Sequence, residues 1–531
     1  MARIRYDPVT IEILWTRLLS IVDEAAATFE RTSFSNLARE SNDYSVIITD
    51  AEGRSLAQNS FAIPSFIGTL PKTVGHFLAR YPLQTLKPGD VLLTNDPWLG
   101  SGHLPDVNTA MPIFRSGRPV AFAAMVSHVA DIGGRPLVTG TRELFEEGLR
   151  LTPLKLMEAG RVNQTLVDVI EGNVRTPKLT MGDIWGQISA CRMVERRLGE
   201  MLEDSGADLA TLGRHIRERS ERAMRGAIRA VPDGRYRFEV RDDGFDGVPV
   251  VVRVAVDVKD DSITADFTGS SLQLPKAVNV VPSYTYAWTA FAIKSVLSPD
   301  LPNNDGAFRP ITASAPEGSI LNPRYPAACN ARHGTGHLIP PVIMGALAAA
   351  VPDKVLAAPG TPLCTLTLSG EHEGRRFASV SFVTAGVGAS ASRDGPSVLA
   401  FPTNVSNTPI ELLEADAPIR VRRREIRKGS GGQGLHRGGD GCVFEFEVVG
   451  DGPISMAFMM NRLKHPAIGL QGGAPGRRSR LLLNGRDLLP DEPVDVSRGD
   501  RVLVATAGGG GFGRRRRRRA NRPAGDGKGE A

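Results

Sequence analysis

Apolar residues recur at helical spacing in three long stretches of the chain. In residues 9–31 they fall on one face of a helix, and Asp7-Pro8 is typical of a helix start. The same spacing predicts helices over residues 181–203 and 209–231. Because the connection between these two is short, we expect them to pack against each other as an antiparallel pair.

Short apolar runs bounded by turn residues predict the strands of the N-terminal part. Residues 44–49 and 55–58 flank an Asp-Ala-Glu-Gly turn, which predicts a hairpin. Residues 91–94 follow a Lys-Pro-Gly-Asp turn and form a buried strand. Residues 110–114 and 120–126 flank an Arg-Ser-Gly-Arg turn, so we expect a second strand pair there.

The second half of the chain has a different pattern. Residues 250–258 and 262–267 alternate between apolar and polar side chains, as paired strands do. Residues 287–297 and 341–351 are almost uniformly apolar, which predicts buried helices. From residue 377 to 504 short strands and glycine-rich turns dominate, as in an all-β region.

These elements predict an α/β protein of mixed sheets with a helical insertion and a β-rich C-terminal part. We expect an N-terminal α/β part over residues 1–235 that carries the candidate site and the helical pair. A mixed, β-rich part over 236–513 and a disordered, arginine-rich tail over 514–531 follow. A chain of 531 residues is long enough to bury more than one core.

Composition narrows the class of protein. Hydrophobic residues make up 41% and charged residues 23% of the chain, which is ordinary for a globular protein. No apolar run approaches the length of about 18 residues that a membrane-spanning helix needs, and the N-terminus lacks the apolar core of a signal peptide. The 4 cysteines are widely spaced, which argues against a disulfide framework and predicts a cytoplasmic protein.

The net charge of +6 resides in the C-terminal tail, because Arg514 to Arg519 are consecutive arginines. Such a run can bind nucleic acid or an acidic surface. No interleaved aromatic residues or basic fold motif accompany it, so nucleic-acid binding is not the expected function. We interpret the tail as a solvated segment.

Histidines and carboxylates gather where the predicted N-terminal strands end. His103 and Asp106 close the segment Asn-Asp-Pro-Trp-Leu-Gly-Ser-Gly-His-Leu-Pro-Asp, and His128 lies in Ser-His-Val-Ala-Asp-Ile-Gly-Gly. A strand pair would bring these three side chains to one end of a sheet. Imidazole and carboxylate groups are ligands of Zn, Mn or Fe ions. The alternative is a hydrogen-bonded loop in which Asp96 and Asp106 stabilise turns.

These motifs resemble those of the hydantoinase B/oxoprolinase family, the second half of ATP-dependent lactam and hydantoin hydrolases. The family pattern combines Asn-Asp-Pro, Gly-Gly and His-Leu-Pro-Asp with a later His-x-x-Asp-Ile-Gly-Gly run. The resemblance extends over residues 7–513. Further matching blocks include Glu146-Glu147-Gly148, Asn173-Val174-Arg175, Asp266-Phe267-Thr268-Gly269-Ser270 and Arg393-Asp394-Gly395.

The resemblance implies one interwoven architecture and the metal-bearing subunit of an ATP-dependent cyclic amidohydrolase of the hydantoinase or 5-oxoprolinase type. An actin-like ATPase partner, of the hydantoinase A type, would phosphorylate the lactam or imide oxygen. This chain would supply metal-activated water to open the ring. ATP would then be bound by the partner in a hetero-oligomer. Consistent with this, the glycine-rich segments around Gly133, Gly432 and Gly510 lack the GxxxxGK[ST] pattern.

The resemblance also adds candidates around the metal site. Asp43 lies in Glu-Ser-Asn-Asp-Tyr-Ser, where the family pattern is Glu-Arg-x-Asp-Phe-Ser, and becomes a candidate fourth ligand. A charged cap before a strand is the alternative role, and Ser41 in place of the arginine leaves the charge balance open. Asp131 is expected to accept a hydrogen bond from a ligand histidine. The segment Phe61–Gly68 lacks the histidine that family members carry there, which leaves the substrate range open.

Cys329, His333 and His337 form a second group of potential metal ligands. Gly334 and Gly336 favour instead a loop that leads into the predicted helix and binds an anion or a substrate carbonyl. We therefore assign His333 and His337 to a substrate loop, with a second metal or a structural use as alternatives. No Gly-x-Ser-x-Gly nucleophile motif is present, and no general acid or base is identified.

Two other functions are compatible with the residues. Acetone and acetophenone carboxylases share the family, and in their ATP-dependent reaction a metal would stabilise an enolate. A non-catalytic scaffold is the third possibility. The sequence leaves 5-oxoproline, a hydantoin and a larger lactam open as substrates, and mixed nitrogen and oxygen ligands suit Zn, Mn and Fe alike.

Overall fold

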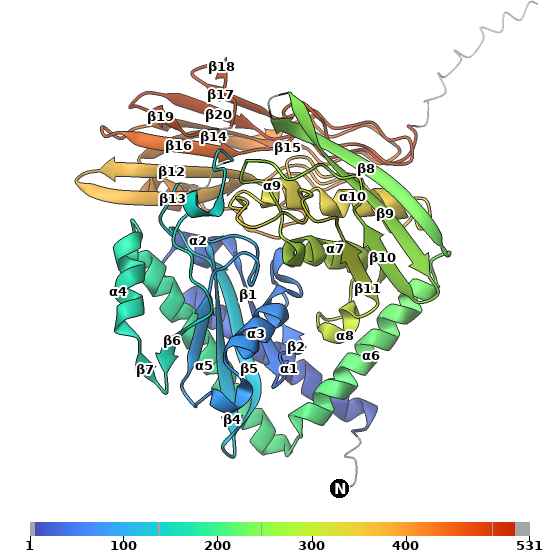
Figure 1. Ribbon diagram of the computed structural model, residues 1–531. Helices are drawn as coiled ribbons and strands as arrows, with labels where there is room; N and C mark the ends of the chain where they lie inside the picture. The colour runs from blue at the N-terminus through green and yellow to red at the C-terminus, as the bar shows by residue number, and fades with distance from the viewer. Residues whose placement is uncertain (1–5, 136–138, 246, 491, 516–531) are drawn as a thin grey trace, which may run out of the picture.

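A computed structural model describes residues 6–135, 139–245, 247–490 and 492–515. Figure 1 shows an N-terminal sheet with helices on its faces, a second sheet beside it, and a C-terminal layer of strands across the top. The expected disordered tail falls almost entirely on residues 516–531, which lie outside the described residues. The α/β fold class with mixed sheets and a β-rich C-terminal part is confirmed.

The N-terminal sheet has seven strands in the order β2-β1-β5-β4-β3-β6-β7, all paired antiparallel. The two predicted strand pairs are both present, and the second is longer at both ends than expected. The strands are β1 (Tyr44–Asp50), β2 (Ser55–Gln58), β3 (Val91–Thr94), β4 (Asp106–Arg115), β5 (Arg118–His128), β6 (Leu154–Glu158) and β7 (Arg161–Val162).

Both faces of this sheet are buried, because successive side chains of a strand point to opposite sides. In β1, Val46 and Ile48 face a core formed with α1 (Pro8–Thr32) and α5 (Pro177–Ser205). Ile47 faces a second core formed with α3 (Thr69–Arg80). The smaller helices around this sheet are α2 (Asn36–Ser41) and α4 (Gln164–Asn173).

The predicted N-terminal helix is confirmed as α1, and its start follows from a side-chain cap. The carboxylate of Asp7 accepts hydrogen bonds from the backbone N–H groups of Val9 and Thr10, and Pro8 occupies the first turn. The helix then buries one face, which includes Leu14, Leu18 and Val22 and packs against the sheet.

The expected antiparallel packing of the two long helices is wrong. Helix α5 packs along α1 and against β4 and β5, whereas α6 (Leu209–Arg229) packs against α8 (Asp305–Phe308) and reaches β1, β2 and β10. Figure 1 shows α5 and α6 diverging from the loop that joins them. The two helices exist as predicted, but α6 connects the N-terminal sheet to the next one.

The second sheet has the order β11-β10-β9-β8, with β10 and β11 parallel and the other pairs antiparallel. Its core includes the two predicted apolar helices, α7 (Pro282–Leu297) and α10 (Ile339–Leu347). A short helix, α9 (His333–Gly336), precedes α10. The strands are β8 (Gly234–Phe245), β9 (Val248–Lys259), β10 (Ser262–Asp266) and β11 (Ile311–Ser314).

Two further sheets share a third core at the C-terminal end, which confirms the β-rich region. One sheet has the order β13-β12-β16-β19 and the other β14-β15-β20-β17-β18. Helix α11 (Ile410–Asp416) is the one α-helix assigned among the described residues after 350. The strands are β12 (Cys364–His372), β13 (Arg375–Val383), β14 (Ile419–Arg427), β15 (Gly441–Val448), β16 (Ile454–Met459), β17 (Arg480–Leu483), β18 (Arg486–Asp487), β19 (Val494–Val496) and β20 (Arg501–Ala505).

The C-terminal glycine-rich segments pack backbone against backbone. Gly509 donates to the carbonyl of Gly439 and accepts from Gly432, and a Cβ at Gly509 would lie 2.1 Å from the carbonyl oxygen of Val387. Glycine is therefore required there for close approach of the chains. Close backbone packing therefore explains why these segments are rich in glycine, and a phosphate-binding role is not needed to explain it.

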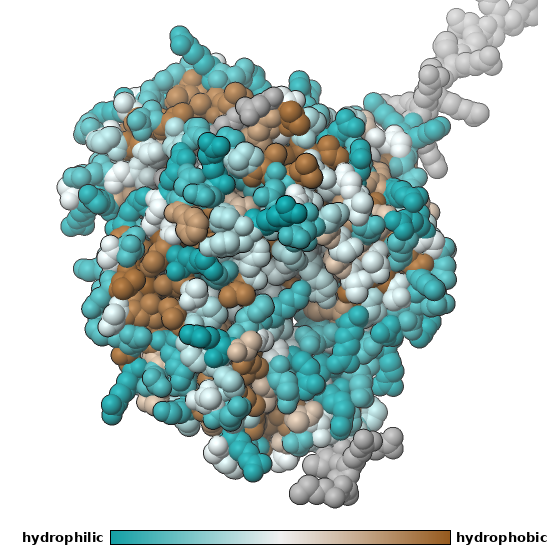
Figure 2. All heavy atoms as spheres, viewed as in Figure 1, coloured by the Kyte–Doolittle hydropathy of each residue, from teal (hydrophilic) through white to brown (hydrophobic). Residues whose placement is uncertain are grey.

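The visible surface in Figure 2 is mostly polar, with apolar residues gathered on the left where Figure 1 places α4. Val162 of β7 and Val169 of α4 are 43% and 42% exposed. Within the described part of the chain, no helix has the length and apolarity needed to cross a membrane.

Candidate metal centre

The register of three strands brings the candidate ligands together. Strands β4 and β5 pair so that Asp106, the first residue of β4, lies opposite His128, the last residue of β5. Strand β1 pairs with the other edge of β5, and the backbone N–H of His128 donates to the carbonyl of Asp43 at 3.0 Å. The prediction that His103, Asp106 and His128 lie at one end of a sheet is confirmed.

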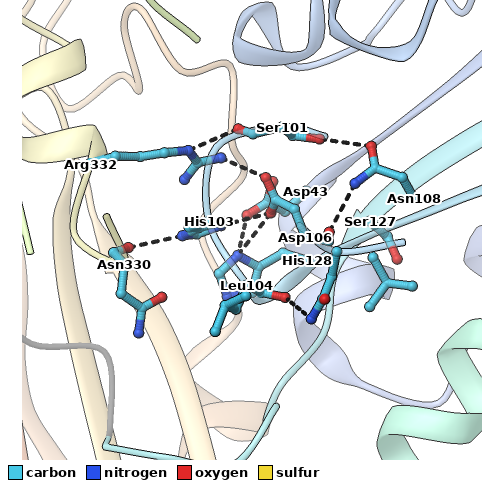
Figure 3. Close-up of polar contacts among 12 residues, drawn as sticks. Asp43, Ser101, His103, Leu104, Asp106, Asn108, Ser127, His128, Asn330 and Arg332 are labelled. Carbon is cyan, nitrogen blue, oxygen red and sulfur yellow. Dashed lines mark hydrogen bonds and ion pairs between the residues drawn. The ribbon is translucent and has the colours of Figure 1, made fainter. Parts of the chain in front are cut away.

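The three predicted side chains converge on one point. One ligand atom from each of His103, Asp106 and His128 lies within 4.8 Å of the other two, and all three residues are buried. The Nε2 atom of His103 is 2.7 Å from Oδ1 of Asp106, and Nδ1 of His128 is 3.5 Å from the same oxygen. Figure 3 shows these side chains pointing toward one another.

The tautomer of His103 follows from its second contact. Its Nδ1 atom is 2.9 Å from the backbone carbonyl oxygen of Asn330, which can only accept a hydrogen bond. Burial, with help from Arg332, lowers the pKa of His103 to about 4, so the ring is neutral at pH 7. The single proton therefore resides on Nδ1, and Nε2 presents a lone pair to the carboxylate of Asp106.

Arg332 is a buried residue of the site that sequence reasoning missed. Its Nη2 atom is 2.5 Å from Oδ2 of Asp106, its Nε donates to the carbonyl of Ser101 at 2.9 Å, and its guanidinium lies 4.0 Å from the ring centroid of Tyr284. An arginine immediately before His333 in an otherwise small and apolar segment was a signal that could have identified it.

The charge of Asp106 depends on Arg332 at neutral pH. Burial opposes ionisation of Asp106, but His103 when protonated and Arg332 at all accessible pH values outweigh it and hold the pKa of the carboxyl below its ordinary range. Because His103 is neutral above about pH 4, Arg332 is the cation that remains. Asp106 is therefore a carboxylate at neutral pH.

Asp43 borders the same point at a greater distance. Its Oδ2 atom is 3.8 Å from Nδ1 of His128, and its side chain is 15% exposed. Burial raises the pKa of Asp43 to about 6, against the opposing effect of His128. The structure thus places Asp43 beside the triad, outside the group of three converging side chains.

These residues fit a divalent cation. A neutral imidazole nitrogen and a carboxylate oxygen, both acceptors, face each other at 2.7 Å between His103 and Asp106. Two lone pairs at that separation repel each other unless a cation or a proton lies with them, and the low pKa of His103 disfavours the proton. Nitrogen and carboxylate ligands together suit Zn, Mn or Fe.

Glu147 is a second residue to which the sequence assigned no role. Its carboxylate is fully buried and accepts hydrogen bonds from the backbone N–H groups of Cys329 and Asn330 at 2.9 and 2.7 Å, and from the hydroxyl of Thr141 at 3.1 Å. Burial raises the pKa of Glu147 to about 7, although these donors act in the opposite direction. The backbone N–H of Asn330 donates to Glu147, and the carbonyl of the same residue orients His103.

His333 and His337 line the cavity that contains the triad and Asp43. Burial lowers the pKa of His333 well below its ordinary value and that of His337 to about 3, so both rings are neutral at pH 7. The expected flexible loop is in fact the short buried helix α9. Among the described residues, the one group with the geometry of a metal site is the triad, and Cys329 instead contacts the carbonyl of Ala327.

Asp131 has partners other than the expected imidazole. Its carboxylate accepts hydrogen bonds from the guanidinium of Arg175 at 2.7 Å, from the Arg175 backbone and from the N–H of Gly133. No contact with a histidine is assigned to it within the described chain. Asp131 therefore anchors the loop after β5, and Asn330 takes the role that was predicted for it.

Comparison with known proteins finds matches over almost the whole chain. The family model described as hydantoinase B/oxoprolinase matches residues 7–515. A protein of Pseudomonas sp. (strain NS671), described as one subunit of a D-/L-hydantoinase, is 30% identical over 473 residues, which cover 85% of this chain and 80% of that protein.

Two solved structures have a similar fold. The crystal structure of an ATP-dependent caprolactamase from Pseudomonas jessenii gives a TM-score of 0.87 at 24% identity and covers 96% of this chain and 92% of that one. A nucleotide-free acetone carboxylase gives 0.86 at 21% identity, covering 96% and 76%. At these identities the similarity concerns the fold alone.

Proposed function

Because the chain belongs to the hydantoinase B/oxoprolinase family, we propose that it is one component of an ATP-dependent cyclic amidohydrolase. The reaction would open the ring of a lactam, an imide or a hydantoin. The similarity to a component of a D-/L-hydantoinase and the fold shared with an ATP-dependent caprolactamase support this assignment. The observation that carries it is the buried triad of His103, Asp106 and His128 inside a cavity.

The triad residues would hold the cofactor of the reaction. His103, Asp106 and His128 would bind a divalent Zn, Mn or Fe ion, with Asp43 as the candidate fourth ligand. When bound, such an ion lowers the pKa of a coordinated water toward about 7 and so makes a nucleophile available at neutral pH.

The surrounding residues prepare the ligands for this role. Asn330 keeps the proton of His103 on Nδ1 and so leaves Nε2 free to coordinate. Arg332 keeps Asp106 ionised and fixes its second oxygen. His333 and His337, neutral and directed into the same cavity, are proposed to orient the cyclic amide without competing for charge.

ATP is proposed to bind to a partner protein of the hydantoinase A type rather than to this chain. The hydantoinase relative is named as one subunit of its enzyme, which supports a hetero-oligomer. The glycine-rich segments of this chain have no Walker sequence. The 4 cysteines are all free and buried, which supports the proposed cytoplasmic location.

An ATP-dependent carboxylase of the acetone type is the second candidate. The fold shared with acetone carboxylase favours it, although the identity of 21% concerns the fold alone. In that case a ketone and bicarbonate would be required for ATP turnover, whereas a cyclic amidohydrolase needs neither.

The test is reconstitution with an ATPase of the hydantoinase A type. We expect ring opening of a cyclic amide to require both proteins, ATP and a divalent metal, and we expect this chain alone to turn over neither ATP nor amide. Turnover of ATP by the isolated chain, or ATP turnover by the complex only with ketone and bicarbonate, would contradict the proposal.

A further inference from the structure

The cavity that contains the triad has one charged end and a wall that is neutral. It comprises about 440 Å³ of space outside protein atoms when the open solvent at its mouth is included. The ionisable side chains of Asp43, Asp106 and Arg332 lie at the triad end. The wall residues are buried, and they are apolar or bear neutral hydroxyl groups. They come from the short 3-10 helix η1 (Pro64–Phe66), from α7, β12 and β13, and from neighbouring loops, and they include Phe66, Trp288, Thr365, Phe382, Thr403 and Val405.

Away from the triad, the described residues that line this cavity offer no unengaged cationic side chain to a negatively charged substituent. Arg332 is the one lysine or arginine among them. Its Nη2 binds Asp106 at 2.5 Å, its Nε binds the carbonyl of Ser101, and its plane lies against Tyr284. His333 and His337 are uncharged at pH 7 because burial lowers the pKa of each.

The wall does offer neutral hydrogen-bonding groups. The hydroxyl of Thr403 and Nδ1 of His337 have no hydrogen-bond partner among the described residues, although Thr403 is 3% and His337 is 2% exposed. A buried polar group without a partner costs free energy that an uncharged amide can recover. A carboxylate in the same place would lose its hydration without gaining a counter-charge.

The geometry points to a substrate class: an uncharged cyclic amide with a hydrocarbon ring or apolar substituent, in preference to one that bears a carboxylate. This inference rests on the proposed function, because the scissile carbonyl has to face the triad. The remaining ring atoms then face the neutral wall, where Phe66, Phe382 and Val405 contribute apolar surface. Specificity would therefore be set by residues distant in sequence from the triad.

The experiment compares substrates that differ in one group. The complex of this chain with its ATPase partner is assayed with 2-pyrrolidinone, 5-oxoprolinamide and 5-oxoproline, which share a five-membered lactam ring. We expect kcat/KM for each uncharged compound to exceed that for 5-oxoproline at least tenfold. Because 5-oxoprolinamide matches 5-oxoproline in size, it separates the effect of charge from the effect of bulk.

The possible results distinguish this inference from the proposed function. Preference for 5-oxoproline would overturn the inference and leave the amidohydrolase function intact. Absence of ATP-dependent ring opening with all three compounds, and with hydantoin, would overturn both. Hydrolysis of 2-pyrrolidinone but not of 5-oxoprolinamide would attribute the selectivity to size and so also overturn the inference.

A charge introduced into the wall gives an independent test. Val405 lines the cavity and is 7% exposed. We expect Val405→Lys to raise the ratio of 5-oxoproline to 2-pyrrolidinone turnover at least tenfold relative to Val405→Met, which has a similar length without the charge. An equal ratio in the two folded variants would contradict a charge-selective wall.

Discussion

A single backbone carbonyl decides which nitrogen of His103 faces the other candidate ligands. The carbonyl of Asn330 accepts a hydrogen bond from Nδ1 and so fixes the proton there. The N–H of Asn330 donates in turn to the carboxylate of Glu147. The hydrogen bonds from Glu147 through the backbone of Asn330 therefore orient the imidazole of the candidate ligand His103. The sequence predicted that His103, Asp106 and His128 would meet, because they lie where the predicted strands end. It could not predict Asn330, because any residue supplies a carbonyl.

Arg332 compensates the buried charge of Asp106, so its loss should be partly reversed by metal. In metal-free protein, Arg332→Met should lower the free energy of unfolding by about 3–5 kcal/mol, the usual loss when one partner of a buried pair is removed. A divalent cation at the triad would replace the missing charge. We therefore expect metal to raise the Tm of Arg332→Met more than that of the wild type, measured by calorimetry with and without chelator.

A matched control is Arg217→Met. Arg217 is also buried and forms an ion pair with Asp50 at 2.9 Å, and neither residue belongs to the metal group. This variant should lose a similar amount of stability and show only the wild-type response to metal. An equal metal-induced rise in Tm for all three proteins would show that Arg332 does not compensate the site.

Glu147 predicts a pH dependence of stability. Its pKa is raised by burial to about 7 in the folded state, above the ordinary value of 4.5. The folded state therefore holds a proton that the unfolded state releases between these values. Stability from this group is fully present below pH 4.5 and declines by about 1.4 kcal/mol per pH unit toward pH 7.

The comparison with Glu147→Gln isolates this effect, since glutamine does not titrate. The stability difference between wild type and variant, from urea unfolding at several pH values, should shift in favour of the variant as pH rises from 4.5 to 7. A difference that is constant with pH, or that shifts the other way, would show that Glu147 is ionised in the folded protein throughout this range.

At the scale of elements, strand pairing assembles the site. Because Asp106 and His128 are register partners on β4 and β5, any slip of this pair would separate them. Apolar runs bounded by turn residues predicted these strands, and helical spacing predicted α5 and α6. The helical spacing of apolar residues shows that one face of α5 is buried, but it does not show which element covers that face. The packing of α5 on α1 rather than on α6 could therefore not be predicted from it.

The loop between β3 and β4 also carries a testable constraint. Gly102 has a φ of +102°, and an added Cβ would lie 2.7 Å from Nε of Arg332. Gly102→Ala should therefore both strain the backbone, by about 1–3 kcal/mol, and displace Arg332. We expect metal affinity, measured by titration calorimetry, to fall at least tenfold.

Gly117→Ala is the matched control, because Gly117 has a φ of +75° and an added Cβ would have no neighbour within 4 Å. It should lose stability from backbone strain and keep its metal affinity. If both variants bind metal as the wild type does, the close packing of Gly102 on Arg332 has no bearing on the site.

At the scale of the whole molecule, the site is closed by parts of the chain that are far apart in sequence. The triad comes from the N-terminal sheet, Arg332 and Asn330 from the segment before α9, and Phe382 from the C-terminal strands. The core of the second sheet already includes Met224, Ile228 and Val231, and the cavity draws on residues from both sides of the boundary expected near residue 235. Local periodicity predicted the elements, and the resemblance to the family predicted the function. Neither could show that the neutral wall faces the triad, because such contacts depend on tertiary packing.

The most direct test of the central claim is the metal content of purified, folded protein, measured by mass spectrometry. Wild type and His436→Ala, a control whose histidine lies outside the metal group, should each carry close to one equivalent of a divalent transition metal. Removal of one imidazole leaves an incomplete coordination sphere. His103→Ala and His128→Ala should therefore lose most of the bound metal while remaining folded. Unchanged metal stoichiometry in both variants would contradict the assignment of this triad as the metal centre.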